Sequence, residues 1–438
     1  MIHFDQARQQ CIESLRKFCD SEAAIQRAVL IDDLFGKIRA VVWLAADAPV
    51  QLPEHIKAEL SASGEAFWSG DLWTPTGERD PDHAVYEGAW EQGVEISTKL
   101  RRADRHRSRG FWLNPPGEPA WPRPTPPVIA FYSFKGGVGR TTALASFAIQ
   151  RARAGERVVV LDLDIEAPGV GTLLDPGEGI SGASWGVLDY LLERPVLQKA
   201  LDLRDYYHAC AREAVTGRGE ILVVPAGRTD NDFLGKLSRV DLEPPVASQK
   251  HPLLLLLEQL REDLQPQWIL LDCRAGISEA AGFVLSGLPH LNVLFGTTSE
   301  QSWLGLGLIL ERLGADRVRR DLPQLECLLV HAMVPEEPTT RSRAEADFLS
   351  RSADEFTDRY YASNPSDPEE DSYWYVRDME SEFAPHLPAA LPYKAKLAFL
   401  KNIDDVADDL ADDPDYQALA ERIASRFSEP DEMEGFES

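Results

Sequence analysis

Two hydrophobic patterns divide the chain. Beyond residue 127, short apolar runs typical of buried strands alternate with segments whose apolar positions recur at helical spacing. The expected strands are Val128–Ser133, Val158–Leu163, Ile221–Val224, Trp268–Leu271, Leu291–Phe295 and Leu325–Val330, and the expected helices are Thr141–Ala154, Leu253–Leu264 and Ser302–Leu313. This alternation predicts an α/β fold with a mostly parallel, doubly wound sheet and helices on both faces.

The first part of the chain predicts a smaller domain. Phe4–Phe18 has helical spacing and Ile38–Ala46 reads as a buried strand, so this domain is α/β or α+β. Residues 114–127 hold seven prolines in fourteen positions, which favours an extended linker over a Pro-rich ligand motif. We therefore expect an accessory domain for recognition or effector coupling at 1–113, a linker at 114–127, and the main domain at 128–438.

The charge is strongly acidic and unevenly distributed. The 438 residues include 45 Lys and Arg against 72 Asp and Glu, a formal charge of −27, divided as −4 over 1–127, −6 over 128–330 and −17 over 331–438. Such a surface repels phosphate backbones and argues against non-specific DNA binding. Lys99–Arg109 is a local exception, with six basic residues followed by Phe111 and Trp112. It fits single-stranded nucleic acid, but we favour a structural or protein-docking role.

Other features predict a cytoplasmic protein. No apolar run approaches the ~20 residues that span a bilayer, and the chain does not open with a basic-then-apolar signal pattern. Five cysteines without a CxxC pair argue against a disulfide framework. Ile403–Pro414 repeats acid pairs at helical spacing and predicts a solvated helix face, and residues 428–438 carry no base that would serve a basic membrane anchor.

The strongest candidate chemistry lies at Phe134–Thr142, which reads FKGGVGRTT between a predicted strand and a predicted helix. Glycines let backbone amides turn onto an anion, and the helix start adds partial positive charge. The residues expected to hold phosphates are Gly136, Gly137, Val138, Gly139, Arg140, Thr141 and Thr142, with the Thr141 hydroxyl directed to Mg²⁺. Arg140 stands where the common phosphate loop has lysine, which predicts secure binding with slow or partner-stimulated turnover.

This loop resembles that of the deviant Walker A ATPases of the ParA/MinD superfamily, and within it the variant subgroup whose loop reads KGGVGR. Val158–Gly169 (VVVLDLDIEAPG) is similar to the second signature strand, and Ile269–Gly276 (ILLDCRAG) is similar to the Walker B strand. Weaker similarity continues to Leu391-Pro392-Tyr393, so the resemblance covers roughly residues 128–400.

The resemblance implies roles for individual residues. Lys135 would reach the nucleotide of a partner subunit, which makes the ATP-bound state a homodimer. Asp162 and Asp164 would lie beside the γ-phosphate, with Asp164 slightly preferred for orienting the attacking water. The implied catalytic residues are thus Lys135, Asp164, Asp162 and Arg140, the metal residues are Thr141, Asp272 and Asp162, and Pro392 and Tyr393 join the nucleotide site.

The implied function is a Mg·ATP-dependent ATPase that switches a homodimer and so regulates or positions a protein partner through its N-terminal domain. One alternative is a weakly or non-hydrolysing nucleotide-binding subunit of a bacterial signalling or antiphage defence complex. Another is a bacterial-type protein tyrosine kinase, suggested by a tyrosine cluster for which aromatic packing is the more economical account: Tyr360, Tyr361, Tyr373 and Tyr375.

Two positions stay open. Arg274 either neutralises γ-phosphate charge or forms an ion pair with Asp272 or Glu279. His331 and Ala332 stand where members of the superfamily often carry an adenine-reading asparagine, so the residue that contacts the base is not assigned.

Overall fold

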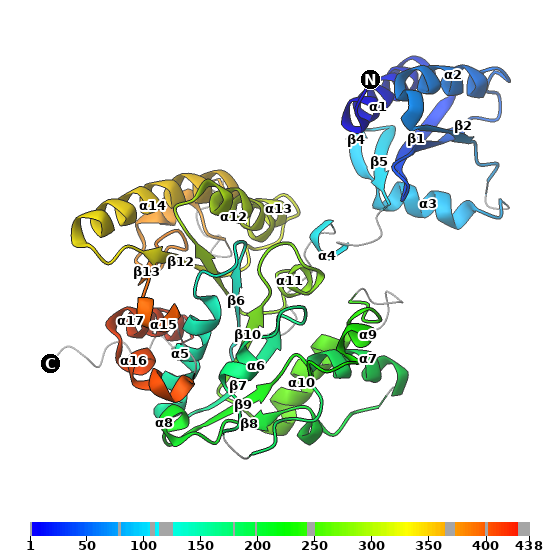
Figure 1. Cartoon of the computed structure of the whole chain (residues 1–438). Coiled ribbons are helices and arrows are strands. Elements are labelled where there is room, and N and C mark those ends of the chain that lie inside the picture. Colours follow the sequence, from blue (N-terminus) through cyan, green and yellow to red (C-terminus); the bar gives the residue numbers. More distant parts are fainter. Residues whose placement is uncertain are drawn as a thin grey trace. The chain divides into compact units, whose positions relative to one another are not determined.

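The chain forms two compact units, Met1–Ser108 and Arg109–Ser438 (Figure 1). The computed structural model describes residues 2–77, 80–105, 110–113, 126–177, 180–197, 199–242, 250–363, 373–398 and 402–427. The predicted linker, apart from its last two residues, and the acidic tail 428–438 lie outside these ranges.

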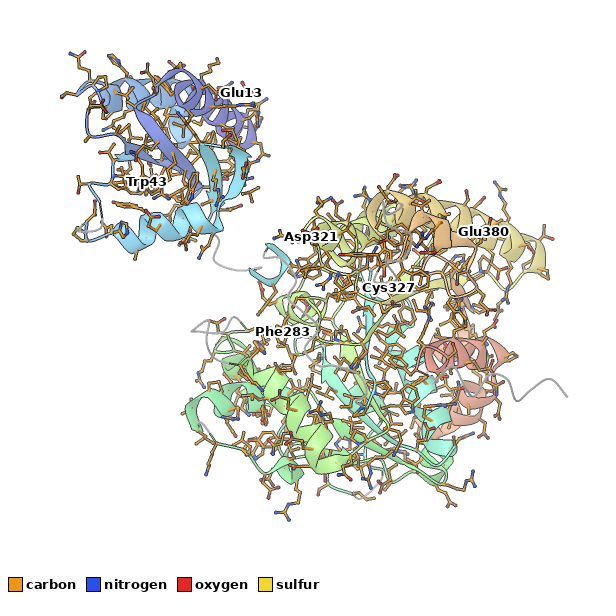
Figure 2. All side chains as sticks on the ribbon, turned by 180° about the vertical axis from the view of Figure 1, so that it is seen from behind. Glu13, Trp43, Phe283, Asp321, Cys327 and Glu380 are labelled. Carbon is orange, nitrogen blue, oxygen red and sulfur yellow. The ribbon has the colours of Figure 1, made fainter. Side chains whose placement is uncertain are left out.

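The N-terminal unit is a mixed five-stranded sheet between helices, in the order β3-β2-β1-β5-β4. Its strands are β1 (Ile25–Asp32), β2 (Ile38–Leu44), β3 (Trp68–Trp73), β4 (Val94–Ser97) and β5 (Leu100–Asp104). On one face α1 (Phe4–Ser21) and α2 (Leu52–Gly64) cover a core that includes Leu15, Ile56 and Leu60, whereas α3 (His83–Gln92) covers the other. Trp43 lies between the sheet and α3 (Figure 2). The predicted helix at 4–18 and strand at 38–46 are confirmed.

The C-terminal unit is built on an eight-stranded sheet in the order β13-β12-β11-β6-β10-β7-β9-β8. Every neighbouring pair is parallel except β8 and β9. The strands are β6 (Val128–Ser133), β7 (Arg157–Leu163), β8 (His208–Ala209), β9 (Glu220–Val224), β10 (Trp268–Cys273), β11 (Leu291–Gly296), β12 (Cys327–Val334) and β13 (Ala389–Pro392). The predicted α/β class and mostly parallel sheet are confirmed.

Helices cover both faces of this sheet (Figure 1). One face carries α5 (Arg140–Arg153), α8 (Glu213–Thr216), α16 (Ala407–Asp412) and α17 (Pro414–Ala424), and the other carries α7 (Val187–Leu197), α10 (Pro252–Leu264), α11 (Glu279–Val284), α12 (Glu300–Leu313) and α14 (Pro338–Arg359). Short helices complete the unit: α4 (Gly110–Leu113), α6 (Val170–Leu173), α9 (Phe233–Leu237), α13 (Ala315–Val318) and α15 (Ala395–Ala398). The observed bounds of the predicted elements differ from the expected ones by a few residues, as hydrogen bonding at their ends decides them.

The acidic segment near the end of the chain packs as the sequence predicts. Its apolar side chains, Val406, Ala407, Leu410 and Ala411, are buried in the core beside α5, whereas Asp408 and Asp409 are exposed. The interpretation as a solvated helix face is therefore confirmed. Among the helices in the described ranges, none is long and apolar enough to cross a bilayer.

Candidate functional site

A tight loop joins the carboxyl end of β6 to the start of α5. Gly137 and Gly139 have φ angles of +74° and +83°, in the left-handed region that favours glycine. Gly139 precedes α5 directly, so the free amides and partial positive charge of the first helical turn lie at this loop. Such a geometry suits an anion.

A cavity of about 400 Å³ lies beside the loop. Its lining combines the loop with residues from the ends of distant strands and from α17: Ser133, Gly136, Gly137, Val138, Gly139, Arg140, Thr141, Thr142, Asp164, Ala275, Met333, Leu391, Pro392, Tyr393, Lys394, Leu397 and Tyr416. Most of the residues expected to bind a nucleotide therefore surround one space. Lys135 is exposed next to the loop, and it makes no hydrogen bond or ion pair within the described ranges.

Two carboxylates meet because β7 and β10 are parallel neighbours that pair Asp162 with Asp272. Asp272 is 1% exposed and accepts hydrogen bonds from the Thr141 hydroxyl and from Nε of Arg140, each 2.8 Å long. Asp164, two residues beyond Asp162, lines the cavity. The ends of two strands and the first turn of α5 thus bring a hydroxyl, a guanidinium and carboxylates together.

Asp162, for which the resemblance implies a place beside the γ-phosphate, does not line the cavity. It is fully buried, and its oxygens accept the backbone N–H groups of Asp164, Gly169 and Gly171 at 3.2, 3.0 and 3.2 Å. Burial raises the pKa of Asp162 to about 7, and the charge of nearby Asp272 adds to the rise. Because it does not line the cavity, these contacts favour a role in fixing the 164–171 segment over direct contact with a ligand.

Arg140 is held by carboxylates rather than pointing freely into the cavity. Besides its bond to Asp272, its Nη2 lies 3.4 Å from an Asp164 oxygen. Burial acts to lower the pKa of Arg140, but the Asp272 carboxylate outweighs it and the pKa is raised. The guanidinium therefore stays charged, and phosphate would have to draw it away from these two acids.

The donor set fits magnesium. A hydroxyl and carboxylates supply the oxygen ligands that Mg²⁺ prefers, and this ion keeps several waters while sharing substrate phosphates. Thr141 would hold the ion, and Asp272, already bonded to that hydroxyl, would orient it. Within the described part of the chain, no group of three or more His, Cys, Asp or Glu side chains forms a metal cage on its own.

The far side of the cavity is largely apolar. Pro392 and Tyr393 line it as expected, together with three residues that the sequence motifs did not indicate, Met333, Leu397 and Tyr416. Tyr416 comes from α17, and no local pattern could have assigned it to this wall. Met333 has a φ of +61°, at an irregularity in the pairing of β12 with β13. Such a wall suits the flat face of a base.

His331 does not face this wall. It is 2% exposed and its ring stacks on Phe348, with 4.0 Å between centroids. Burial lowers its pKa to about 4, so the ring is neutral. The strand-end position where the resemblance led us to look for a base-reading residue therefore belongs to the core.

The ion pairs of Arg274 differ from the expected ones. Instead of Asp272 or Glu279, its Nη1 pairs with Glu166 and lies 4.0 Å from Asp164. The prediction of an ion pair is correct, but the predicted partners are wrong. Both actual partners follow β7, the strand beside β10, and the sequence does not show that these two strands are neighbours.

The basic segment Lys99–Arg109 is, where the structure describes it, part of the N-terminal sheet. Arg101 stacks over the Trp90 ring at 4.5 Å, and Arg102 pairs with buried Asp32 at 2.9 Å. Lys99 donates to the Cys19 carbonyl. These contacts agree with the structural interpretation; residues 106–109 lie outside the described ranges.

Most of the tyrosine cluster is buried. Tyr360, Tyr361 and Tyr375 are 0%, 6% and 3% exposed, and Tyr361 donates to or accepts from His386 at 2.8 Å. Burial raises the pKa of Tyr361. Their side chains are packing residues, which agrees with the interpretation favoured from the sequence and offers little support for a phosphate-accepting cluster.

Comparisons with known proteins find similarity over part of the chain. The model of the CobQ/CobB/MinD/ParA nucleotide binding domain matches residues 129–334. A MinD-type septum site-determining protein of Oltmannsiellopsis viridis is 31% identical over 179 residues, 40% of this chain and 46% of that protein. An uncharacterized ATP-binding protein of Methanocaldococcus jannaschii is 28% identical over 234 residues, 50% of this chain and 77% of that protein. The match thus spans less than half of the first relative.

Solved structures include the MinC:MinD cell division complex of Aquifex aeolicus, with a TM-score of 0.40 and 17% identity over 69% of this chain and 97% of that one. A plasmid partition protein of Borrelia burgdorferi bound to AMPPNP gives a TM-score of 0.43 with 15% identity over 69% and 98%. The chain therefore carries, at residues 129–334, a segment that matches the CobQ/CobB/MinD/ParA nucleotide binding domain.

Proposed function

We propose that the C-terminal unit binds Mg·ATP and hydrolyses it slowly, and that the bound nucleotide switches a homodimer that regulates or positions a protein partner. The observation that carries this proposal is a cavity of about 400 Å³ that residues from distant parts of the C-terminal unit line together. Its lining combines the glycine-rich loop, Thr141 and Asp164 with apolar side chains such as Tyr416.

In this proposal, each part of the cavity has one task. The loop amides and the first turn of α5 hold the phosphates, since unpaired N–H groups and the helix dipole both favour negative charge. Mg²⁺, when bound, neutralises phosphate charge and polarises the terminal group. Thr141 would hold that ion, and Asp272 would orient the Thr141 hydroxyl. Asp164 would orient the attacking water.

Arg140 explains why turnover should be slow. Its guanidinium is shared by Asp272 and Asp164, the two acids that metal binding and water activation would use. Phosphate binding must draw Arg140 away from these acids before both are available. While Arg140 keeps these contacts, the two acids are not free for metal binding and water activation, which makes hydrolysis slow.

Lys135 is the candidate for contact between subunits. It is exposed at the edge of the cavity and engages no described side chain. The N-terminal unit, with its own core and sheet, is the candidate for contact with the partner.

Light scattering with and without Mg·ATP tests this proposal. We expect wild type to dimerise with the nucleotide, Lys135→Ala to remain monomeric, and Lys57→Ala, which removes an exposed lysine of α2, to behave as wild type. Nucleotide-dependent dimerisation of Lys135→Ala would refute the role of Lys135. No binding of Mg·ATP to wild type in calorimetry would refute the proposal as a whole.

A second function, a regulatory subunit that holds nucleotide without turnover, is favoured by the same engagement of Arg140 with Asp272 and Asp164. Phosphate release separates the two functions. Release that falls at least tenfold in Asp164→Ala supports the ATPase, whereas release at the same low level in wild type and variant supports the regulatory subunit.

A further inference from the structure

Arg274 lies on a loop that contacts the phosphate loop. The next residue, Ala275, lines the cavity, and a Cβ on Gly136 would lie 3.9 Å from the Cβ of Ala275. The N–H of Gly276 donates to the Ser133 carbonyl at 3.1 Å. These two contacts hold the loop that carries Arg274 close to the phosphate loop.

The guanidinium of Arg274 is held by carboxylates that follow β7. Its Nη1 forms a close ion pair with Glu166 and lies 4.0 Å from Asp164. A guanidinium carries five N–H donors, and no hydrogen bond of the other nitrogens is found within the described ranges. These donors are available to an incoming anion of suitable geometry.

Asp164 links Arg274 to the cavity. One of its oxygens lies 3.4 Å from Arg140 and the other 4.0 Å from Arg274, so this carboxylate sits between two guanidinium groups. A third phosphoryl group, beyond the two that the loop would hold, adds negative charge at this end of the cavity. The Asp164 carboxylate repels that charge, so a further cation besides Mg²⁺ and Arg140 would favour its binding.

We propose that Arg274 is this cation, and that it distinguishes a nucleoside triphosphate from a diphosphate by leaving Glu166 and donating to the terminal phosphoryl group. The proposal rests on the nucleotide-binding function proposed above. Arginine suits the task, since its planar donors match phosphate oxygens.

Glu166 competes with the phosphate for Arg274, because it is the ion-pair partner of Arg274 when no nucleotide is bound. Its side chain is 48% exposed, against 14% for Asp164, so solvent weakens its attraction for the guanidinium. A phosphate oxygen in the enclosed cavity forms the stronger bond. The Arg274 guanidinium therefore binds the terminal phosphoryl group when a triphosphate is present and pairs with Glu166 when it is not.

Binding measurements on the full chain test the proposal, with ADP and the β,γ-imido analogue of ATP as probes in the presence of Mg²⁺. We expect Arg274→Gln to weaken analogue binding by about tenfold and to change ADP binding less than twofold, because only the terminal phosphoryl group loses its donor. Glu166→Gln should strengthen analogue binding by about two- to fourfold, since the resting ion pair is lost. Arg319→Gln, which breaks an exposed ion pair with Glu311, is the matched control.

Each outcome is decisive. Equal effects of Arg274→Gln on both nucleotides, or none on the analogue, would overturn the proposal, as would weaker analogue binding in Glu166→Gln. If Arg274→Gln still binds ADP, the proposed nucleotide-binding function holds whatever the result for the analogue. Thermal melting of each variant shows that it is folded.

Discussion

Arg140→Ala tests the arrangement of buried charges at the heart of the site. The substitution removes the Nε donor that lies 2.8 Å from Asp272 and leaves a carboxylate of 1% exposure with the Thr141 hydroxyl as its remaining side-chain donor. Breaking a buried ion pair from one side costs about 3–5 kcal/mol, because an uncompensated charge stays in a poorly solvated place. We expect a loss of that size in the free energy of unfolding of the C-terminal unit.

The double variant Arg140→Ala, Asp272→Asn should regain most of this loss. Asparagine carries no charge, and its carbonyl can still accept the Thr141 hydroxyl. The destabilisation of the single variant should also be larger at pH 8 than at pH 5. Burial raises the pKa of Asp272, loss of Arg140 raises it further, and protonation at low pH removes the unpaired charge.

Urea unfolding followed by circular dichroism measures these differences. The N-terminal unit is a built-in reference, since a change at Arg140 does not touch its core. A loss below about 1 kcal/mol in Arg140→Ala would refute the reasoning, because this is the range of an exposed ion pair. Strictly additive losses in the double variant would refute it as well, since two contacting groups should be coupled.

Three further predictions concern stability, the loop and the apolar wall. The pKa of Asp162 rises to about 7 in the folded chain from an ordinary value in the unfolded one. Its contribution to stability is therefore present at low pH and is lost as pH rises towards 7, and Asp162→Asn should flatten this dependence in urea unfolding at pH 5 and 8. In Gly305→Ala, the added Cβ would overlap the Phe134 ring, which precedes the phosphate loop. Gly305→Ala should weaken ADP binding in calorimetry and leave the circular dichroism spectrum unchanged. Gly235→Ala, whose added Cβ meets only the end of a flexible side chain, should bind ADP as wild type does. Equal ADP binding by the two variants would contradict the link between α12 and the loop. Tyr416→Ala, which opens the apolar wall, should weaken ADP binding by about five- to tenfold and leave inorganic triphosphate unaffected; equal loss for both ligands would show that the wall does not contact the nucleoside.

Several features could be predicted because they are local. Alternating strand and helix patterns require a parallel sheet with helices on both faces, since an apolar strand must be covered on each side. The glycines at 137 and 139 could be located because positive φ angles have a clear residue preference. The buried sides of residues 403–411 likewise follow from spacing alone.

Partners across the fold could not be predicted in this way. Arg274 pairs with Glu166 and Asp164 because β7 and β10 are neighbours, although about 100 residues of chain lie between them. Tyr416 reaches the cavity because α17 packs beside β13. Composition alone left nucleic-acid binding open for Lys99–Arg109, although a structural or protein-docking role was favoured. The sheet gives Lys99, Arg101 and Arg102 partners of their own.

The sequence alone thus determined the class of fold, the phosphate-type loop and the strands that carry the acids, because each depends on residues close together in the chain. Only the tertiary structure decided the partners of three charged groups. Arg140 contacts both Asp272 and Asp164, Asp162 accepts hydrogen bonds from backbone N–H groups, and Arg274 forms an ion pair with Glu166. Ion pairs and burial depend on which strand ends meet in space. That adjacency is set by the packing of the whole sheet, and no local pattern contains it.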